Sequence, residues 1–430
     1  MPFIRFSISS KKEISLFSQS AFFLLNTISI SVYGALFWWI LSQFYTSEQV
    51  GIFVLLISIT QLITTLSQFG FTFSITRYLP EVEDKRNFIN FTWTLAFSIM
   101  LILVFLFFLG GRNIYPILEQ LSDDIFLSID FILLAASIMT MQLIYPVLVA
   151  TRGGASLLVM NIIAGSLRII IVTLVLRNSS LSALLLSYWL PNAIASIYAI
   201  FVAIPRLIPN FFFRPNIRFE HWNLIKNYTF GSVIGNLLHD LPFQIMPQMI
   251  AVNLGLSDTA YFFIAWNIYG ILIMVSSAIS LSLLVEGIHN QHKLRNLTSN
   301  ALLATLIINF MLAGTIILLS KPILYLFGND YAANGENLLK YLALSVIPAG
   351  ILNVKIANLR IQEAIGKVVL AYFIICFVSI GLGNWSFTNA RLESFGLIWI
   401  LAQSCSLLFV IFSNTQKREY NAQNRSSTSL

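Results

Sequence analysis

The sequence has few charged residues, and this shortage excludes most soluble classes of protein. Only 10% of its 430 residues are Asp, Glu, Lys or Arg, whereas a soluble domain carries about one in four. Hydrophobic residues make up 57% of the chain, and the mean hydropathy is +0.81. So few charges cannot cover a water-exposed surface, which excludes a cytosolic enzyme, a secreted disulfide scaffold and a disordered chain. The composition predicts an all-α polytopic membrane protein.

The residue types that most often bind metals or act as nucleophiles are also scarce. The chain has two cysteines and four histidines. Both cysteines, Cys376 and Cys405, lie inside apolar stretches, where a thiol acts as a small hydrophobic side chain. The sequence has no phosphate-binding loop, no cluster with metal-ligand spacing and no nucleophile elbow. We therefore expect a protein that is not an enzyme, with no catalytic residues, no cofactor and no metal.

The basic residues give the chain a net charge of +7, but they lie singly in short polar segments and not in one patch. This pattern argues against a nucleic-acid partner. Most of the 25 basic residues fall in segments that would share one side of a membrane. By the positive-inside rule, that side is cytoplasmic, and both termini lie on it.

Twelve apolar stretches are long enough to cross a bilayer, which takes about 20 helical residues. The first stretch is too long for the apolar region of a cleavable signal. The approximate limits are 16–43, 49–77, 88–110, 125–150, 154–176, 181–204, 227–254, 258–286, 297–319, 338–362, 366–386 and 393–414.

The longest polar connection divides the twelve spans into six and six. It mixes Arg with Phe and Trp, which suits a linker lying in the headgroup layer. Six spans per half give both halves the same orientation, so we expect two pseudo-symmetric six-helix bundles around a central cavity. The predicted parts are an N-terminal bundle over 1–204, a cytoplasmic or interfacial connector over 205–226, a C-terminal bundle over 227–414 and a disordered cytoplasmic tail over 415–430.

The two halves also share a short pattern. The second span begins with Ser47–Phe53 and the eighth with Ser257–Phe263, and each has a Ser, then an acid, then an aromatic and apolar run. Such a pattern indicates a parallel internal repeat. Short Ser-acid entries are also common helix caps.

Three motifs resemble the second-span signature of the polysaccharide flippases, which include the O-antigen flippases. They are SEQVGIF from Ser47, QFGF from Gln68 and RYLPE from Arg77. This family belongs to the superfamily that also holds the multidrug and toxin extrusion transporters. The resemblance extends over nearly the whole chain through the span number, the predicted topology, the connector after the sixth span and an Asp in the middle of the seventh. The family often has Asp-Arg there, whereas Asp240 is followed by Leu241.

The resemblance implies a function and partners. These flippases move undecaprenyl-pyrophosphate-linked oligosaccharides from the inner to the outer face of the bacterial inner membrane. By resemblance, we expect an alternating-access flippase for an O-antigen or related polysaccharide repeat unit. The expected partners are this lipid-linked oligosaccharide and membrane lipids, with a polysaccharide polymerase and chain-length proteins as further candidates.

Ionisable residues inside spans cost about 2.5–3.5 kcal/mol on insertion scales, which makes them functional candidates. Arg168 lies deep in the fifth span, on the same helix face as Asn161 and Gly165. A guanidinium can hold a phosphate with two parallel hydrogen bonds, so we expect Arg168 to bind the pyrophosphate; the alternative is a packing pair with an acid. Lys355 in the tenth span is a second candidate for the same ligand, although its amine could instead reach water at the cytoplasmic end.

Asp240 lies near the middle of the seventh span and is the candidate for proton or ion coupling. Asn236, Asp240 and Gln244 step by four residues and form one polar stripe. A carboxylate in an apolar environment favours its neutral form, which is the property that a proton carrier needs. The alternative is a structural acid that neutralises a basic residue. We expect the neighbouring His239 to face elsewhere on the helix and to be a core residue.

Uncharged polar residues in several spans predict a wet central cavity, although such residues also bond helices to one another. Arg77 and Glu286 end the second and eighth spans on the cytoplasmic side. They are candidates for a cytoplasmic gate, and ordinary anchoring at the membrane surface explains them equally well. The predicted cavity-lining residues are Asn26, Gln61, Gln68, Asn161, Asn236 and Gln244.

Other transport and polysaccharide classes fit less well. A cation-coupled drug or toxin extrusion antiporter should present acids to its cavity. A membrane polysaccharide polymerase normally needs a large outer loop, whereas the outer loops here are short. A major-facilitator carrier has a basic Gly-Asp-Arg motif after the second span, where this chain reads RYLPEVEDKRN. A peptidoglycan-precursor flippase usually has two further spans.

Overall fold

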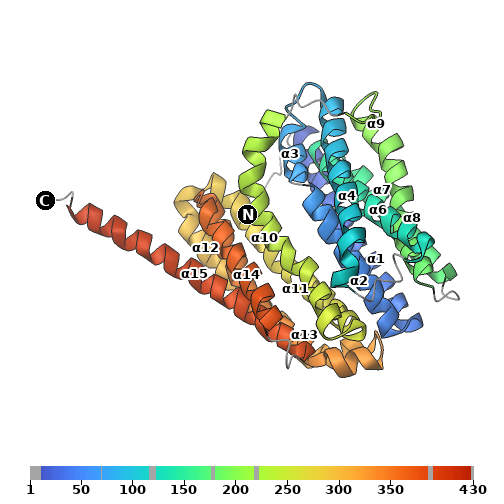
Figure 1. Cartoon of the computed structure of the whole chain (residues 1–430). Coiled ribbons are helices and arrows are strands. Elements are labelled where there is room, and N and C mark those ends of the chain that lie inside the picture. Colours follow the sequence, from blue (N-terminus) through green and yellow to red (C-terminus); the bar gives the residue numbers. More distant parts are fainter. Residues whose placement is uncertain are drawn as a thin grey trace, which may run out of the picture. The chain divides into compact units, whose positions relative to one another are not determined.

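A computed structural model describes residues 11–68, 70–115, 123–175, 180–216, 222–385 and 391–427. Over these ranges the regular secondary structure is helical and contains no strand (Figure 1). Eleven of the described helices are long and apolar enough to cross a membrane. Many large apolar side chains on them face outward; Leu318 and Leu174 are 82% and 74% exposed, which suits lipid and not water. The prediction of an all-α polytopic membrane protein is confirmed.

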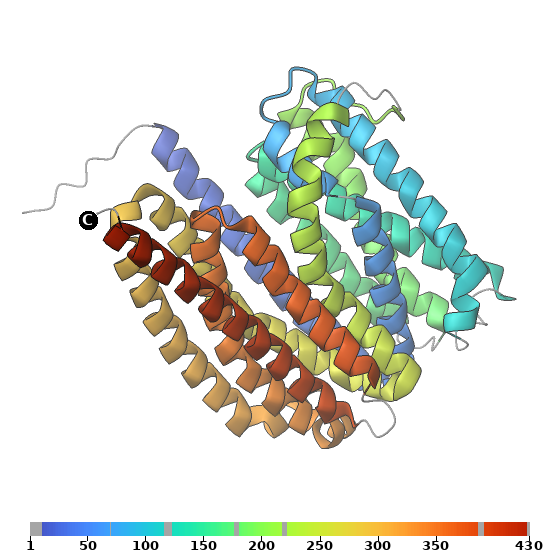
Figure 2. The same cartoon turned by 60° about the vertical axis from the view of Figure 1, so that its left-hand side comes forward.

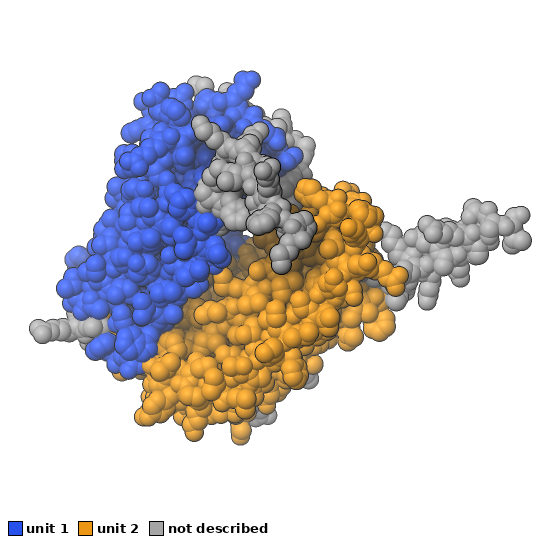
Figure 3. Space-filling view, turned by 180° about the vertical axis from the view of Figure 1, so that it is seen from behind, with its two compact units in different colours: residues 1–44, 63–232 blue, residues 45–62, 233–430 orange. Residues whose placement is uncertain are grey.

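The chain divides into two compact units, which Figure 3 colours separately. Unit 1 contains residues 1–44 and 63–232, and unit 2 contains residues 45–62 and 233–430. Two helices contribute residues to both units: α2 (Ser47–Gln68) and α10 (Trp222–Asn253). The other helices of unit 1 are α1 (Lys11–Phe44), α3 (Phe71–Tyr78), α4 (Lys85–Ile114), α6 (Ile125–Ala150), α7 (Gly154–Val175), α8 (Leu181–Tyr198) and α9 (Ile204–Leu207), with a π-helical turn over Ala199–Ala203 between α8 and α9. The other long helices of unit 2 are α11 (Leu256–His289), α12 (Leu294–Tyr325), α13 (Asn329–Ile361), α14 (Ile365–Trp385) and α15 (Leu392–Ser427).

Two of the predicted spans differ from the structure. The span expected over 49–77 is two helices, because Gly70 adopts a φ of 76°, which an α-helix does not accommodate. The span expected over 227–254 corresponds to α10, a long helix that is not among the eleven apolar candidates. Its described part is interrupted by polar residues, which lower its hydropathy: Asn236, His239, Asp240, Gln244 and Gln248.

Residues 45–62, which the sequence places in the N-terminal bundle, fall in unit 2. The start of α2 meets the start of α11, because the Ser47 hydroxyl donates to the Ser257 hydroxyl at 3.1 Å. The Tyr261 hydroxyl, one turn along α11, donates to Ser47 at 3.3 Å. The two Ser residues that begin the matched sequence patterns therefore lie side by side in the folded protein.

The helix α13 is the centre of unit 2. It packs against α11, α12, α14 and α15, and the gold to red helices α12–α15 form one bundle in both Figure 1 and Figure 2. Its buried residues occur along its whole length, from Tyr331 to Ile361. A helix that buries most of its circumference belongs in the interior of a bundle.

One buried amide ties three helices of unit 2 together. Asn309 of α12 is fully buried. Its Nδ2 donates to the Val346 carbonyl of α13 at 2.8 Å, and its Oδ1 accepts a hydrogen bond from the Ser276 hydroxyl of α11 at 2.8 Å. Because an unpaired amide is costly away from water, this network fixes how the three helices face one another.

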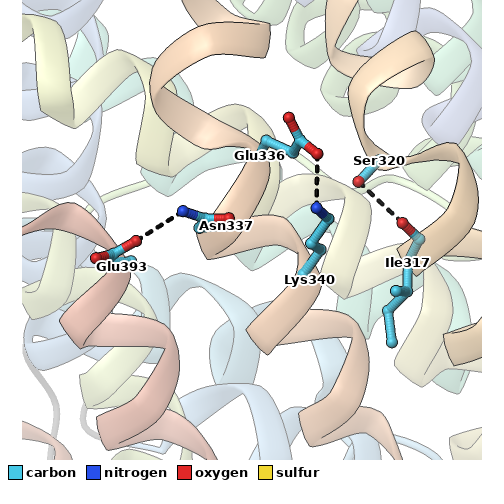
Figure 4. Close-up of polar contacts among 6 residues, drawn as sticks. All are labelled: Ile317, Ser320, Glu336, Asn337, Lys340 and Glu393. Carbon is cyan, nitrogen blue, oxygen red and sulfur yellow. Dashed lines mark hydrogen bonds and ion pairs between the residues drawn. The ribbon is translucent and has the colours of Figure 1, made fainter.

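Polar contacts lie near several helix ends in unit 2, and one of them joins two helices (Figure 4). The Asn337 Nδ2 on α13 donates to Glu393 Oε2 at the start of α15 at 2.9 Å. On α13, the Lys340 ammonium pairs with Glu336 one turn earlier at 2.6 Å. The Ser320 hydroxyl near the end of α12 bonds to the Ile317 carbonyl at 3.0 Å. The Asn337–Glu393 contact links α13 to α15, whereas the other two contacts lie within a single helix.

The first part of the connector over 205–226 is docked on unit 1. Phe211 and Phe213 each place their ring 6.0 Å from that of Trp93 on α4. The Asn90 Nδ2 on α4 donates to the Phe212 carbonyl at 3.2 Å. At the other end of the chain, α15 continues to Ser427, into the segment over 415–430 that the sequence predicts to be disordered.

We expect Gly350→Ala to destabilise unit 2. A Cβ at Gly350 would lie 2.0 Å from Asn309 Nδ2 and 2.8 Å from the Ser276 hydroxyl, so the substitution forces the buried network apart. Overpacking of this kind costs about 1–3 kcal/mol. The melting temperature of the purified protein in detergent should fall by several degrees. Gly314→Ala on α12 is the control, because a Cβ added there would meet no atom within 4 Å, and equal melting temperatures for both variants would contradict the prediction.

Candidate functional site

The helices α1 and α7 of unit 1 are joined by polar side chains along their length. Asn26, which the sequence predicts to line a cavity, is only 4% exposed and accepts a hydrogen bond from Asn161 of α7. The structure therefore uses both predicted cavity residues to join two helices, as polar residues in membranes commonly do. Three hydrogen bonds between described residues of the two helices are Gly154 N to Gln19 Oε1 at 3.0 Å, Asn161 Nδ2 to Asn26 Oδ1 at 2.8 Å and the Tyr33 and Ser166 hydroxyls at 2.9 Å.

Arg168 lies beyond these contacts on α7 and is half-buried. Its guanidinium carbon lies 3.9 Å from the ring centroid of Tyr188 on α8 and 5.6 Å from that of Phe37 on α1. Its Nη2 donates to the Asn192 amide oxygen of α8 at 2.8 Å. Aromatic faces attract a cation through their quadrupole, so the three helices hold the guanidinium in one place without neutralising it.

No carboxylate forms an ion pair with Arg168 in the part of the chain that the structure describes. Its Nε is buried and has no hydrogen-bond partner there. The alternative of a packing pair with an acid therefore finds no support among the described residues. A guanidinium without a carboxylate partner keeps hydrogen-bond donors that an anion could accept from.

The remaining sequence candidates of α2 and α3 are dispersed. The Gln68 side chain of α2 bonds to Gln142 of α6 and accepts from Thr72 of α3, so it too joins helices. Gln61 is half-buried on α2, and Arg77 is exposed at the end of α3. The gate role of Arg77 stays a prediction.

In unit 2, Asp240 and His239 form a pair. The His239 Nδ1 and the Asp240 Oδ1 lie 2.8 Å apart, and the two side chains are 45% and 51% exposed. The His239 ring also meets the Tyr372 ring of α14 edge-on at 4.9 Å. The expectation that His239 is a core residue facing away from Asp240 is wrong, because the two side chains contact each other and both are about half exposed.

His239 lines a cavity of about 410 Å³ inside unit 2. The helices α10, α11, α13, α14 and α15 all contribute to its walls. Aromatic and aliphatic side chains form most of the wall, and amides and hydroxyls lie among them. The aromatic residues are Phe243, Tyr269, Tyr372 and Trp399, and the uncharged polar residues are Asn236, Ser277, Ser280, Asn353 and Gln403.

Among these polar lining residues, the sequence predicts Asn236 alone. Arg360 also lines the cavity, and its Nη2 donates to the Tyr372 hydroxyl at 3.4 Å. The predicted topology places Arg360 at the cytoplasmic end of a span and gives it no role in a site. The spacing of Asn353, Ala357 and Arg360 on one face of α13 is the signal that could have placed it.

Lys355, Gln244 and Glu286 are not part of this cavity wall. Lys355 is half-buried on α13 and forms no hydrogen bond or ion pair with any described residue. Gln244 is 8% exposed. Glu286 is exposed near the end of α11, where it accepts a hydrogen bond from Asn290, and its gate role stays a prediction.

No group of His, Cys, Asp and Glu residues could hold a metal ion within the ranges that the structure describes. Of the two cysteines, Cys376 is buried and Cys405 is exposed, and both are free. The groups present at Arg168 and in the cavity of unit 2 are cations, amides, hydroxyls and aromatic rings.

No protein-family model matches the chain, and no curated protein matches it in sequence. Solved structures match it in fold. One, described as the lipid II flippase MurJ in an inward closed conformation, gives a TM-score of 0.77 at 14% identity over 91% of this chain and 87% of that chain. An inward-facing multidrug resistance MATE family transporter of the MOP superfamily gives 0.67 at 13% identity, over 93% and 99%. A Vibrio cholerae MATE transporter, VcmN, gives 0.62 at 11% identity, over 94% and 97%. The chain therefore has the fold of these transporters.

We expect Asn192→Leu to destabilise unit 1, because it removes the acceptor that holds Arg168. A buried donor left without its partner costs about 1–3 kcal/mol, so the melting temperature should fall. The double variant Arg168→Leu/Asn192→Leu should recover part of the loss, since removing both partners leaves no unpaired charge. Additive losses in the double variant would show that the two residues stabilise the protein independently.

Proposed function

We propose that this chain is a flippase that moves a pyrophosphate-linked lipid oligosaccharide across the bacterial inner membrane by alternating access between its two units. The observation that carries the proposal is the unneutralised guanidinium of Arg168. A cation held among apolar helices lowers the cost of bringing an anion into the same place. Pyrophosphate supplies that negative charge, whereas a neutral lipid or a drug cation does not.

The surroundings of Arg168 suit recognition of phosphate oxygens. A guanidinium has five N–H donors in a planar fork, and a single bond, to Asn192, occupies one of them among the described residues. The Tyr188 ring lies against the guanidinium carbon at 3.9 Å and covers one side of the fork. The donors that remain can hold two oxygens of one phosphate in parallel.

Two further observations support the proposed substrate class. The fold is shared with a structure described as a lipid II flippase, which supports a lipid-linked substrate. The motifs from Ser47, Gln68 and Arg77 resemble those of polysaccharide flippases, which supports an O-antigen or related repeat unit. A polysaccharide polymerase and chain-length proteins are the partners that this pathway would require.

A cation-coupled drug or toxin antiporter is the second candidate, because MATE transporters share the fold. An organic cation needs a carboxylate or an electron-rich wall without a competing positive charge. Arg168 has no carboxylate partner in the described ranges, and among the same residues the cavity of unit 2 is lined by Arg360 and by no Asp or Glu. The sign of the charge favours the flippase. A membrane polymerase gains no support from the solved structures that share the fold.

For the coupling we propose Asp240, paired with His239. Outward movement of an anion is favoured by an inside-negative potential, by about 2.3 kcal/mol per charge per 100 mV. Return of the empty carrier then requires a step of its own, and a proton taken up by the pair outside and released inside would reset it. Lys355 remains a proposed second contact for the pyrophosphate, and both termini are proposed to be cytoplasmic.

Arg168→Ala should reduce surface polysaccharide by at least about tenfold, because the bidentate contact contributes charge-assisted hydrogen bonds. Arg168→Lys should recover only part of the activity, since an ammonium lacks the planar fork. The measurement is an immunoblot of surface polysaccharide in cells that depend on this chain, with membrane expression confirmed. Arg206→Ala, near the end of α9, is the matched control. Normal polysaccharide with Arg168→Ala would remove Arg168 from the mechanism, and drug resistance conferred by the chain without a polysaccharide phenotype would favour the antiporter.

Asp240→Asn should abolish the response of transport to an imposed proton gradient. The amide keeps the size of the side chain but carries no titratable proton, so reset of the carrier no longer depends on pH. The experiment measures flipping of a labelled undecaprenyl-pyrophosphate-linked oligosaccharide in proteoliposomes at several inside and outside pH values. Asp330→Asn, at the exposed start of α13, is the control and should keep the wild-type response. An unchanged pH response in Asp240→Asn would contradict the coupling role.

A further inference from the structure

The cavity of unit 2 follows α13 for about three helical turns, from Ala349 to Arg360. At about 1.5 Å per residue, this stretch is about 16 Å long. Its volume of about 410 Å³ falls within the range of about 300–1,000 Å³ typical of sites for small molecules. The cavity is therefore large enough for a ligand and is elongated along one helix.

A buried amide in the wall lacks a partner. Gln403 of α15 is only 6% exposed, lines the cavity and forms no hydrogen bond with any residue that the structure describes. Elsewhere in the wall, on α13, the Asn353 Nδ2 reaches the Ser277 hydroxyl only at 3.4 Å. The Gln403 amide and the weakly bonded Asn353 amide therefore mark places in the cavity wall where a ligand with several hydrogen-bonding groups would bind.

The charges of the cavity wall limit the chemical class of ligand that the cavity can bind. Arg360 lies at the cavity end of α13 and has the Tyr372 hydroxyl as its hydrogen-bond partner; no described carboxylate pairs with it. Among the described residues, no Asp or Glu lines the cavity, and the nearby Asp240 carboxylate is bonded by His239. An organic cation would meet Arg360 without a counter-charge, and a hydrocarbon chain would leave Gln403 unpaired.

The aromatic rings supply what a sugar needs in addition to the amides. Phe243, Tyr269 and Trp399 line the cavity, and the ring of Phe243 contacts that of Trp399 at 5.7 Å. Aromatic faces are negative, so they attract the weakly positive C–H groups on the face of a sugar ring. Hydroxyl groups around the edge of the same ring can bond to amides and serines.

We propose that the cavity of unit 2 is a binding site for a sugar ring, with Gln403 and Asn353 bonding its hydroxyls and Arg360 favouring a ring that carries a carboxylate. The site deepens the proposed function, on which it rests for the source of the sugar: it would receive part of the transported oligosaccharide and select for acidic sugars. Binding of the free sugar, however, requires neither a lipid nor transport.

The test is saturation-transfer difference NMR on the full chain in nanodiscs, with free glucuronate, glucose and tetraphenylphosphonium as probes. Glucuronate and glucose should both receive saturation, and glucuronate should bind about five- to tenfold more tightly, as one charge-assisted hydrogen bond allows. Gln403→Leu should weaken both sugars about tenfold, the loss that one hydrogen bond of about 1.4 kcal/mol gives. Arg360→Gln should remove the preference for glucuronate, so that the two sugars bind with about equal affinity.

Matched controls are Asn267→Leu and Arg295→Gln, whose residues are exposed in unit 2 and lie outside the cavity wall; both should bind the sugars as the wild type does. Should Gln403→Leu fail to fold by its melting temperature, Asn353→Ala, at a half-buried position, should weaken both sugars in its place. Absence of saturation transfer to both sugars, equal effects of cavity and control variants, or binding of tetraphenylphosphonium alone would overturn the proposal.

The free sugars carry no pyrophosphate, so the result of the NMR experiment does not depend on the role of Arg168. The two proposals can therefore be refuted independently. Loss of polysaccharide in Arg168→Ala without any sugar binding would refute the sugar site and leave the flippase standing. Sugar binding together with normal polysaccharide in Arg168→Ala would remove Arg168 from the mechanism and leave the sugar site standing.

Discussion

A polar group inside a bilayer has no water to bond to, so each one must find its partner within the protein. Most of the described polar side chains in the spans meet this requirement through neighbouring helices or their own helix. Asn26 bonds to Asn161 between α1 and α7, and Asn309 bonds to two other helices of unit 2. These bonds set the pairing of helices, because any other pairing would leave an amide unsatisfied in an apolar environment. A polar group that stays unsatisfied under this constraint therefore stands out as a place for a ligand.

Arg168 in unit 1 and Gln403 in unit 2 are two such groups. The surrounding helices hold Arg168 by a ring face and a neutral amide, so its charge stays available. Gln403 lies among aromatic rings and hydroxyls with no hydrogen-bond partner in the described chain. One group suits the charged part of an amphipathic substrate and the other suits its hydroxyl-rich part. In the proposed function, the sign of the charge at Arg168 is what favours an anionic substrate over a cation in this fold.

The helix α13 shows how one element serves both structure and binding. One of its faces presents Val346 and Gly350 to Asn309 on α12. Another face, with Asn353 and Arg360, lines the cavity. The rigid network on the first face fixes the position of the second, since a packed interior transmits small displacements.

Composition and hydropathy alone determined the class of the protein and nearly all of its long helices, because burial in lipid acts on each segment separately. They also singled out Arg168, since the cost of an ion in an apolar helix is a local property. The tertiary structure decided which groups each polar side chain contacts. Whether a polar residue such as Asn26 faces a neighbouring helix or a cavity depends on contacts between segments far apart in the chain. The orientation of His239 beside Asp240, and the place of Arg360 in a cavity wall, likewise follow from how helices pack, which periodicity within one helix does not specify.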